Sequence, residues 1–273
     1  MLKASVIIAF YNNVKSLKMI LTALNNQYDD NFDVVIADDG SNDENVNEVK
    51  SLSSNYLFDI HHVWHEDKGF RKNKILNQAI MKATNDYLIF IDGDCIPQDN
   101  FVSDHLSQSE PCTCLNGRRA DLSPTVSDQI REKDHAEPNK LFKSYRSAIL
   151  SDYLRGKGKN IEKGFRITQP TLSAFLNRKN KGLVGCNFSA NKADLLSING
   201  FDERYEAPGI GEDSDIDYRL RLAGVKVKNV FFMANQIHLY HVELPRSSVN
   251  EALFDKVRQE KIAYTPYGIN KSE

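Results

Sequence analysis

The sequence predicts an open α/β fold, in which a mostly parallel sheet carries helices on both faces. Short apolar runs alternate with segments whose apolar residues recur at helical spacing. Acidic pairs directly follow two of the apolar runs, where ligands bind at the carboxyl ends of parallel strands. A chain of 273 residues with 41% hydrophobic content is long enough to bury a full core.

The elements of the first part follow one another in strict alternation. The first strand is expected over 4–9, and the next helix starts after an Asn cap at Asn12 or Asn13. The apolar stripe of that helix consists of Val14, Leu17, Ile20, Leu21 and Leu24. Strand, helix, strand, helix and strand are then expected over 33–37, 43–52, 60–64, 72–83 and 87–91. Right-handed crossovers would place these helices on both faces of the sheet.

A basic segment interrupts this pattern. Residues 131–182 hold 13 Lys or Arg against 5 Asp or Glu, a net charge of +8, which leaves -10 on the remainder of a chain whose net charge is -2. The segment predicts short helices around 141–154 and 171–177, with a mobile loop at 155–159 between them. One interpretation is a solvated surface insertion. The other is a lid, or a docking surface for an anionic acceptor or a membrane face.

Two acidic pairs stand where strands end. Asp38-Asp39 follows the second predicted strand, and Asp92-Gly93-Asp94 follows the strand over 87–91. Carboxylates are the ligands that Mg²⁺ and Mn²⁺ prefer, and crowded carboxylates need a cation or a donor-rich ligand to offset their repulsion. An Asp-Gly turn explains one such triplet equally well. Two pairs at converging strand ends favour a binding site.

The most acidic stretch lies near the C-terminal end. After a strand over 183–190, residues 209–217 lead into a helix that stops at Gly224. Acids at a helix N-terminus compensate its dipole, and we interpret Asp215 and Asp217 as capping and surface charges. Glu212 and Asp213 follow two glycines that permit close approach, which favours a catalytic role for one of them.

Two histidines close to this end bear on metal binding. In an extended segment His238 and His241 point to opposite faces, so we expect only one of them to bind an ion. The four cysteines lack the paired spacing of a zinc site, and we expect reduced, mostly buried thiols. No apolar run reaches the length of a membrane span, and the first residues lack a signal-peptide pattern. The sequence therefore predicts a cytoplasmic protein, which the basic segment could bring to the inner face of the membrane.

Five motifs in a fixed order carry a resemblance to a known family. They are Ser5-Val6-Ile7-Ile8-Ala9-Phe10-Tyr11-Asn12, Asp38-Asp39-Gly40-Ser41, Glu66-Asp67-Lys68-Gly69-Phe70-Arg71, Asp92-Gly93-Asp94 and Gly211-Glu212-Asp213. In this order they resemble the inverting family 2 glycosyltransferases with the GT-A fold, a Rossmann-like α/β fold. Among these the chain is most similar to bacterial capsule enzymes of the chondroitin-polymerase type and to the β-1,4-galactosyltransferases. The resemblance covers nearly all of the chain except 119–181.

The resemblance implies a nucleotide site built from the strand ends. Its residues would be Ala9, Phe10, Tyr11, Asp38, Asp39, Asp67, Arg71, Asn77, Asp92 and Gly93. Asp38 or Asp39 would accept from the uracil N3–H, and Asp92 would meet the ribose. The implied division of one domain over 1–273 is a nucleotide-binding half at 1–118, a basic insertion at 119–182 and an acceptor-binding, catalytic half at 183–273.

The resemblance also implies the metal and the chemistry. Asp94 and His241 would hold Mn²⁺ or Mg²⁺, which stabilises the leaving diphosphate as a Lewis acid. Asp213 would be the general base, and the acceptor or donor sugar would be held by Glu212, Gly211 and Asn187. One inverting displacement needs no covalent intermediate and no nucleophilic Ser or Cys.

The implied substrates are a nucleotide sugar, with UDP as the nucleotide, and a glycan or lipid-linked glycan acceptor in surface polysaccharide or glycoconjugate synthesis. Two rival functions remain. A nucleotidyltransferase would carry a Gly-rich basic loop after the first strand, where this chain has Tyr11-Asn12-Asn13. A catalytically silent scaffold that binds a sugar nucleotide or polysaccharide would not need Asp94, Asp213 and His241. The acidic remainder disfavours nucleic acid as a partner.

Overall fold

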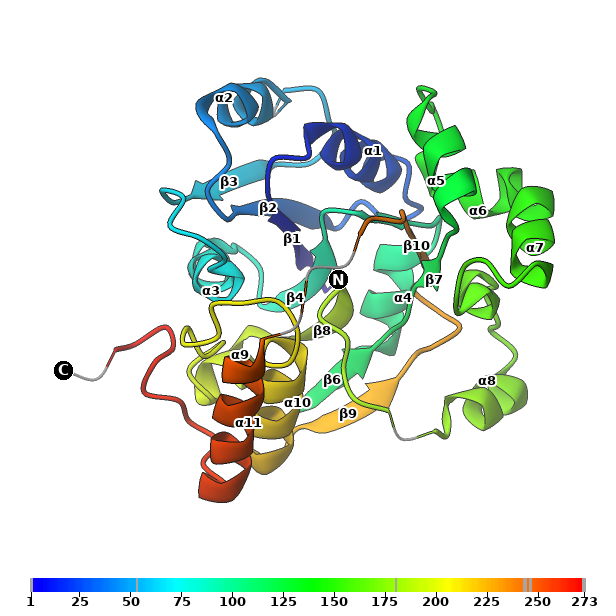
Figure 1. Cartoon of the computed structure of the whole chain (residues 1–273). Helices are drawn as coiled ribbons and strands as arrows, with labels where there is room; N and C mark the ends of the chain where they lie inside the picture. Colours follow the sequence, from blue (N-terminus) through cyan, green and yellow to red (C-terminus); the bar gives the residue numbers. More distant parts are fainter. Residues whose placement is uncertain (1, 53, 180, 243–244, 246, 272–273) are drawn as a thin grey trace.

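The computed structural model describes residues 2–52, 54–179, 181–242, 245 and 247–271. Its centre is a seven-stranded sheet in the order β3-β2-β1-β4-β8-β6-β9 (Figure 1). The strands are β1 (Ala4–Phe10), β2 (Phe32–Asp38), β3 (Ile60–Trp64), β4 (Tyr87–Asp92), β6 (Thr113–Asn116), β8 (Asn187–Asn191) and β9 (Lys226–Asn229). Every pair is parallel except those of β8, which is antiparallel to both β4 and β6. The predicted α/β class with a mainly parallel sheet is confirmed.

Helices cover both faces of the sheet because successive strand residues point to opposite sides. In β1, Val6 and Ile8 pack into one apolar cluster, and Ile7 packs into another. The first cluster is completed by α1 (Val14–Asn25), α2 (Asp43–Leu52) and α4 (Phe101–Gln108). The second is completed by α3 (Lys72–Lys82), α9 (Lys192–Ser197) and α10 (Asp213–Leu222). The predicted cap of the first helix is present, since the Asn13 side chain accepts from the Ser16 N–H at 3.2 Å.

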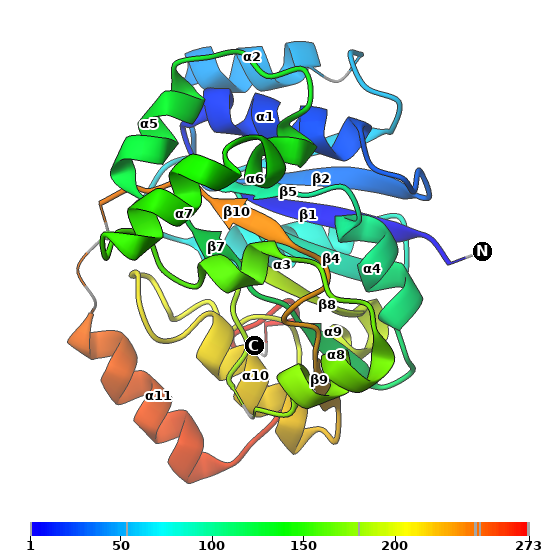
Figure 2. The same ribbon diagram turned by 90° about the vertical axis from the view of Figure 1, so that its right-hand side faces the viewer.

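The basic segment and the residues just before it form a layer of their own on one side of the molecule. It contains α5 (Pro124–Arg131), α6 (Leu141–Ser144), α7 (Arg146–Leu154), α8 (Pro170–Asn177) and the 3-10 turns η1 (Pro138–Lys140) and η2 (Ile161–Gly164). These helices lie on the right in Figure 1 and face the viewer in Figure 2. The short helices expected near 141–154 and 171–177 are thus present. The loop expected at 155–159 is attached to the fold, because Asp121 and Lys159 exchange two backbone hydrogen bonds of 2.9 Å.

A small second sheet joins this layer to the strand ends. It has the order β5-β10-β7, from β5 (Cys95–Pro97), β10 (Gln236–His238) and β7 (Ala120–Asp121). The last helix is α11 (Ser248–Glu260). No helix of the described part of the chain is long and apolar enough to cross a membrane. The four cysteines are free thiols, and only Cys112 among them is exposed.

Two sequence-based boundaries are corrected. The strand expected over 183–190 begins only at Asn187, and residues 184–186 instead line the cleft beside it. The acid-rich helix begins at Asp213, so that residue stands in its first turn. Both shifts bring polar groups to the edge of the sheet where β1, β2 and β4 end.

Candidate active site

A pocket of about 970 Å³ opens at the carboxyl ends of β1, β2 and β4. Segments far apart in the sequence close it, namely 118–121, 181–186 and 208–213. Eleven residues that the sequence singled out line it: Ala9, Phe10, Tyr11, Asp39, Asp67, Asp92, Gly93, Asp94, Glu212, Asp213 and His241. Parallel strands thus gather side chains at one sheet edge, as expected for a ligand site in an open α/β fold.

At one end of the pocket, two carboxylates accept hydrogen bonds from neighbouring protein groups. The Tyr11 hydroxyl donates to Asp67 Oδ2 at 3.0 Å. Asp39 accepts from the Arg71 backbone N–H at 2.9 Å and shares a 2.8 Å hydrogen bond with His65 Nε2. Burial raises the pKa of Asp39 against these hydrogen bonds. The Gly69 N–H and the Tyr11 hydroxyl lower the pKa of Asp67. Two carboxylates, those of Asp39 and Asp67, thus line this end of the pocket.

Gly93 allows the two central strands to approach at the floor of the pocket. A Cβ atom at this position would lie 2.7 Å from the Ala9 carbonyl oxygen, a contact that side chains do not tolerate. The residue between the two acids therefore has to be glycine for the β1 and β4 ends to lie as they do. The close approach places Asp92 and Asp94 beside the Ala9–Tyr11 turn.

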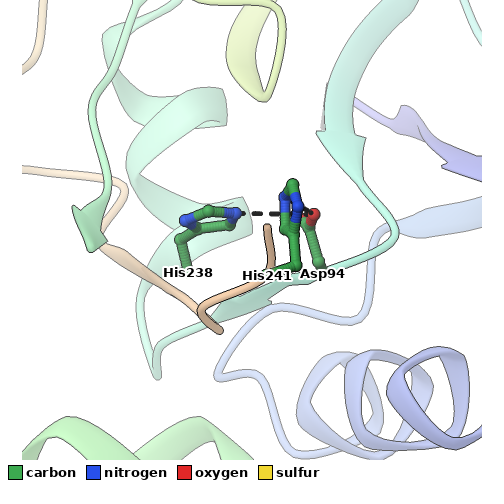
Figure 3. Close-up of side chains that lie close together, drawn as sticks. All are labelled: Asp94, His238 and His241. Atoms are coloured by element: carbon green, nitrogen blue, oxygen red, sulfur yellow. Dashed lines mark ion pairs between the residues drawn. The ribbon is translucent and has the colours of Figure 1, made fainter. Parts of the chain in front are cut away.

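Asp94, His238 and His241 face one another in Figure 3. One ligand atom of each lies within 4.8 Å of the others. Asp94 Oδ2 is 3.1 Å from His241 Nε2 and 3.4 Å from His238 Nε2. Although burial opposes it, the two neighbouring imidazoles hold the pKa of Asp94 well below its usual range. Asp94 is therefore ionised, as a metal ligand must be.

The orientation of His238 fits a metal ligand. Its Nδ1 hydrogen bonds to Asp121 Oδ1 at 3.1 Å, the carboxylate partner that metal-bound histidines commonly have. Its Nε2 is buried without a hydrogen-bond partner among the described residues and points into the cluster. The expectation that the two histidines point to opposite faces is wrong, since both imidazoles lie beside Asp94. Because β10 ends at His238, the strict alternation of a strand does not extend to His241.

A lysine joins two of the pocket acids. Lys72 Nζ lies 2.6 Å from Asp92 Oδ1 and 2.7 Å from Glu212 Oε1. Against the cost of burial, these two carboxylates raise the pKa of Lys72, which keeps its charge. Burial, opposed by Lys72 and assisted by the charges of Asp92 and Asp213, raises the pKa of Glu212 to about 7. The lysine thereby connects the end of β4 to the start of α10 across the pocket.

Asp213 stands in the first turn of α10 and lines the same pocket. Burial raises its pKa, while a hydrogen bond from the Ser214 hydroxyl, at 3.2 Å from Oδ1, opposes the rise. A carboxylate with a raised pKa is a better proton acceptor than a solvated one. The arrangement can therefore bind a cation at one point and remove a proton at another.

Two asparagines that the resemblance places in the site lie outside its lining. Asn77 is 2% exposed, and its side chain bonds to both the N–H and the C=O of Phe201 at 2.8 Å. Asn187 is fully buried and donates to the carbonyls of Arg118, at 2.7 Å, and Ala234, at 2.9 Å. Both amides satisfy backbone groups, so each supports the pocket wall from behind.

Three further residues that the resemblance assigns to the site do not line the pocket. Asp38 is buried against the Ser41 N–H, at 2.8 Å, and His62, at 2.9 Å, so Asp39 alone of the pair reaches the pocket. Arg71 turns its guanidinium to the Glu66 carbonyl and lines a second cleft. Gly211 lies outside the lining with φ +134°, where a Cβ atom would meet the Tyr205 ring. Its role is to permit the turn before Glu212.

Asp215 is also corrected. It is 1% exposed, accepts from Arg219 Nε at 2.7 Å and from the Tyr205 hydroxyl at 3.3 Å. It is a buried ion-pair partner, whereas Asp217 pairs with Arg221 at the surface-facing side of α10, at 3.0 Å. The reading of Asp215 as a surface charge is wrong because its helical face turns toward Tyr205.

Lys72 and His238 are the site residues that sequence reasoning missed. A signal for Lys72 existed: it is the first residue of α3, where a cation opposes the helix dipole. A lysine at this position needs nearby carboxylates to offset its repulsion by the helix dipole. Arg119 and Asp121 also line the pocket, and they lie before the basic segment, in the part of the chain that the resemblance does not cover.

Comparison with known proteins agrees with this site. The model of the glycosyl transferase family 2 matches residues 5–119, and that of the N-terminal domain of galactosyltransferase matches residues 172–242. The first match holds the acidic strand ends, and the second holds Glu212, Asp213 and both histidines. The fold is that of the GT-A glycosyltransferases, and residues 5–119 match a glycosyltransferase family. The chain carries a glycosyltransferase family 2 domain, as the sequence motifs predict.

Relatives agree with this assignment over part of their length. The chain is 26% identical to the uncharacterized glycosyltransferase YfnE of Bacillus subtilis, with 89% of this chain and 66% of that protein covered. It is 27% identical to a chondroitin synthase of Escherichia coli, with 88% of this chain and 35% of that protein covered. The chain therefore spans between one third and two thirds of these relatives.

Solved structures share the fold. S. aureus TarS 1-349 in complex with UDP-GlcNAc superposes with a TM-score of 0.55 at 16% identity, covering 89% of this chain and 60% of that one. The mannosyltransferase PcManGT from Pyrobaculum calidifontis, in complex with GDP-Man and Mn²⁺, gives 0.56 at 13% identity, covering 94% of this chain and 61% of that one.

Proposed function

We propose that this glycosyltransferase is metal-dependent and inverting, and that it moves a sugar from a UDP-sugar to a glycan acceptor. The observation that carries the proposal is that Asp94 and His241, two members of the Asp94–His238–His241 cluster, line the same pocket as Asp213. The cluster suits a divalent cation, and Asp213 suits proton removal. Formation of a surface polysaccharide or glycoconjugate is the setting that the relatives suggest.

The donor nucleotide would occupy the end of the pocket formed by Tyr11, Asp39 and Asp67. Asp39 is the acid of its pair that remains accessible, so it would accept from the uracil N3–H. The UDP-GlcNAc complex of the structural neighbour supports uridine as the base. Asp92, already paired with Lys72, would meet the ribose.

The cation would be held by Asp94, His241 and His238. Two imidazoles with one carboxylate suit Mn²⁺ better than Mg²⁺, which prefers oxygen ligands. The Mn²⁺ complex of the second structural neighbour supports this choice. When bound, the ion would supply Lewis-acid stabilisation of the diphosphate that leaves.

Asp213 would take the proton of the acceptor hydroxyl as that hydroxyl attacks the anomeric carbon from the face opposite the diphosphate. The configuration would invert in this single displacement. Glu212, held by Lys72 at 2.7 Å, would position the acceptor sugar.

The proposed division assigns residues 1–118 to the nucleotide and residues 183–273 to the acceptor and catalysis. The acceptor would be a glycan or a lipid-linked glycan. It would enter past residues 119–182, since Arg131, Asn160 and Lys181 of that insertion line the pocket. We propose a cytoplasmic site of action at the inner face of the membrane.

The test is a donor screen that follows nucleoside diphosphate release from a panel of UDP-sugars, with and without Mn²⁺, and with Asp213→Asn as the matched inactive variant. We expect release from one UDP-sugar that needs Mn²⁺ and falls in the variant. Release from a GDP- or CMP-sugar alone would reject uridine, and unchanged release in EDTA would reject the metal. Pyrophosphate production from a nucleoside triphosphate and a sugar phosphate would instead favour a nucleotidyltransferase.

A further inference from the structure

The outer side of residues 141–181 combines strong positive charge with exposed apolar side chains. This stretch contains ten Lys or Arg against two Asp or Glu. One of the two acids, Asp152, is buried, so Glu162 is the acid that this side exposes. The exposed cations include Lys143, Arg155, Lys157 and Lys179. The rest of the chain has the opposite net charge, so the basic character is confined to this layer.

Helix α8 is held in place but fully buries none of its side chains. All eight of its residues are described, and none of them is buried. The backbone before it is fixed by the Ile167 N–H, which donates to the Phe232 carbonyl at 2.9 Å. Its last residue, Asn177, accepts from the Phe231 N–H at 2.8 Å. Because amphipathic helices gain most of their stability from packing, a tethered helix with a bare apolar side indicates a missing partner.

The four most exposed apolar residues of this stretch belong to the helices α7 and α8. Leu172 and Phe175, which is 55% exposed, lie three residues apart on α8. Tyr153 and Leu154, which is 87% exposed, end α7. Figures 1 and 2 agree that α7 and α8 lie on the same side of the molecule, and Figure 2 looks onto that side. We call Tyr153, Leu154, Leu172 and Phe175, with the exposed cations of 141–181, the α7–α8 face.

We propose that the α7–α8 face binds the surface of a lipid bilayer that contains anionic lipids. Cations near such a surface are attracted by its potential, and Leu and Phe gain by entering the region between headgroups and acyl chains. A soluble polyanion would use the cations but would leave the apolar side chains in water. The presence of both on one face therefore selects a bilayer. This inference does not depend on the proposed reaction, because the four apolar residues lie outside the pocket lining.

Docking by this face would also place the pocket near the bilayer. Arg131, Asn160 and Lys181 belong to the same insertion and line the pocket. A lipid-linked acceptor could then reach the site without leaving the membrane surface.

The experiment is co-sedimentation of the full chain with vesicles of phosphatidylcholine alone or with 30% phosphatidylglycerol added, at low and high salt. Three variants are compared: Leu172→Ser with Phe175→Ser, Lys143→Gln with Lys157→Gln and Lys179→Gln, and, as a control, Leu57→Ser. Leu57 is 89% exposed and lies between α2 and β3. Circular dichroism and a thermal melt verify that each variant is folded.

We expect binding only to the anionic vesicles, weakened by salt. The partition coefficient should fall about tenfold or more in both the apolar and the charge variants, because each replaced residue contributes to the free energy of membrane binding. It should remain unchanged in the control. Absence of binding to anionic vesicles at low salt would overturn the proposal. Equal binding by wild type and the apolar variant would also overturn it, and would assign the face to a polyanion instead. Dextran sulfate, used as a soluble competitor, would then bind wild type and the apolar variant alike.

Discussion

Replacing Lys72 by Met should cost the protein several kcal/mol of stability in a way that depends on pH. The side chains of Lys72, Asp92 and Glu212 are 16%, 24% and 18% exposed, so the cluster lies mostly out of water. Methionine keeps the length of the chain but removes the charge that both carboxylates face. Breaking a buried ion pair typically costs about 3–5 kcal/mol, and partial exposure places this case near about 3 kcal/mol.

The pH dependence follows from the pKa of Glu212, which is already raised to about 7. Without Lys72 that pKa rises further, because the partner that opposes the rise is gone. Proton uptake by Glu212 then relieves part of the repulsion at low pH. The stability loss of the variant should therefore be smaller at pH 6 than at pH 8.5, where the carboxyl must ionise.

The assay is urea unfolding of wild type, Lys72→Met and Lys72→Arg at both pH values. Lys72→Arg retains the charge and should recover most of the loss. Lys18→Met is the matched control, since Lys18 pairs with Glu48 at the surface, where the two side chains are 47% and 39% exposed. Surface pairs contribute no more than about 1 kcal/mol. A loss in Lys72→Met that equals the control at both pH values would refute the reasoning.

Three further predictions concern the pocket and its wall. Asp94→Asn should abolish Mn²⁺-supported turnover with little change in the melting curve. His238→Ala should raise the Mn²⁺ concentration needed for half-activity by about tenfold or more. If wild type and His238→Ala gave the same metal titration curve, His238 would be excluded as a ligand. Asp213→Asn should retain Mn²⁺ and donor binding in calorimetry while turnover at saturating acceptor falls by about 10²–10⁴-fold, and near-normal turnover would assign the base elsewhere. The third concerns stability. Burial lowers the pKa of His105 from 6.5 to about 4. The neutral, buried His105 therefore contributes its full share of the unfolding free energy above pH 6.5. This share is lost as the pH falls toward 4, because the unfolded chain takes up the proton first. Urea unfolding at pH 7 and pH 5 should show about 2 kcal/mol more loss in wild type than in His105→Gln, and equal losses would contradict the shift.

The sheet and most of its pocket were predictable because they depend on strand ends. Asp39, Asp92 and Asp94 follow apolar strands directly, and parallel pairing brings such ends to one edge. The position of Asp213 at the pocket was predictable for a different reason, since four acids in six residues exceed what one helix start requires. Its role as general base stays a prediction. These features are local in sequence and need only the topology to bring them together.

The failures share a physical cause, because they depend on where a side chain turns after the backbone is fixed. An asparagine such as Asn77 can satisfy a ligand or a neighbouring main chain equally well, and sequence does not distinguish the two. The side chain of His238 was assigned by strand alternation, which fails one residue beyond the end of β10. The partners of Lys72 are Asp92 at the end of β4 and Glu212 at the N-cap of α10, 20 and 140 residues later in the chain, which no local pattern reveals.

The antiparallel strand β8 has a consequence for how this chain is made. Its register pairs Tyr87 with Asn191 and Ile91 with Asn187, so β4 acquires this neighbour only after 95 intervening residues have been synthesised. At usual elongation rates the wait lasts about 5–20 s. During that time β4, with Leu88 and Phe90 on one side, is an uncovered sheet edge of the kind that recruits other chains. A nascent chain or a fragment that stops before residue 187 leaves this edge of β4 unpaired, and we expect it to aggregate more readily than the full chain.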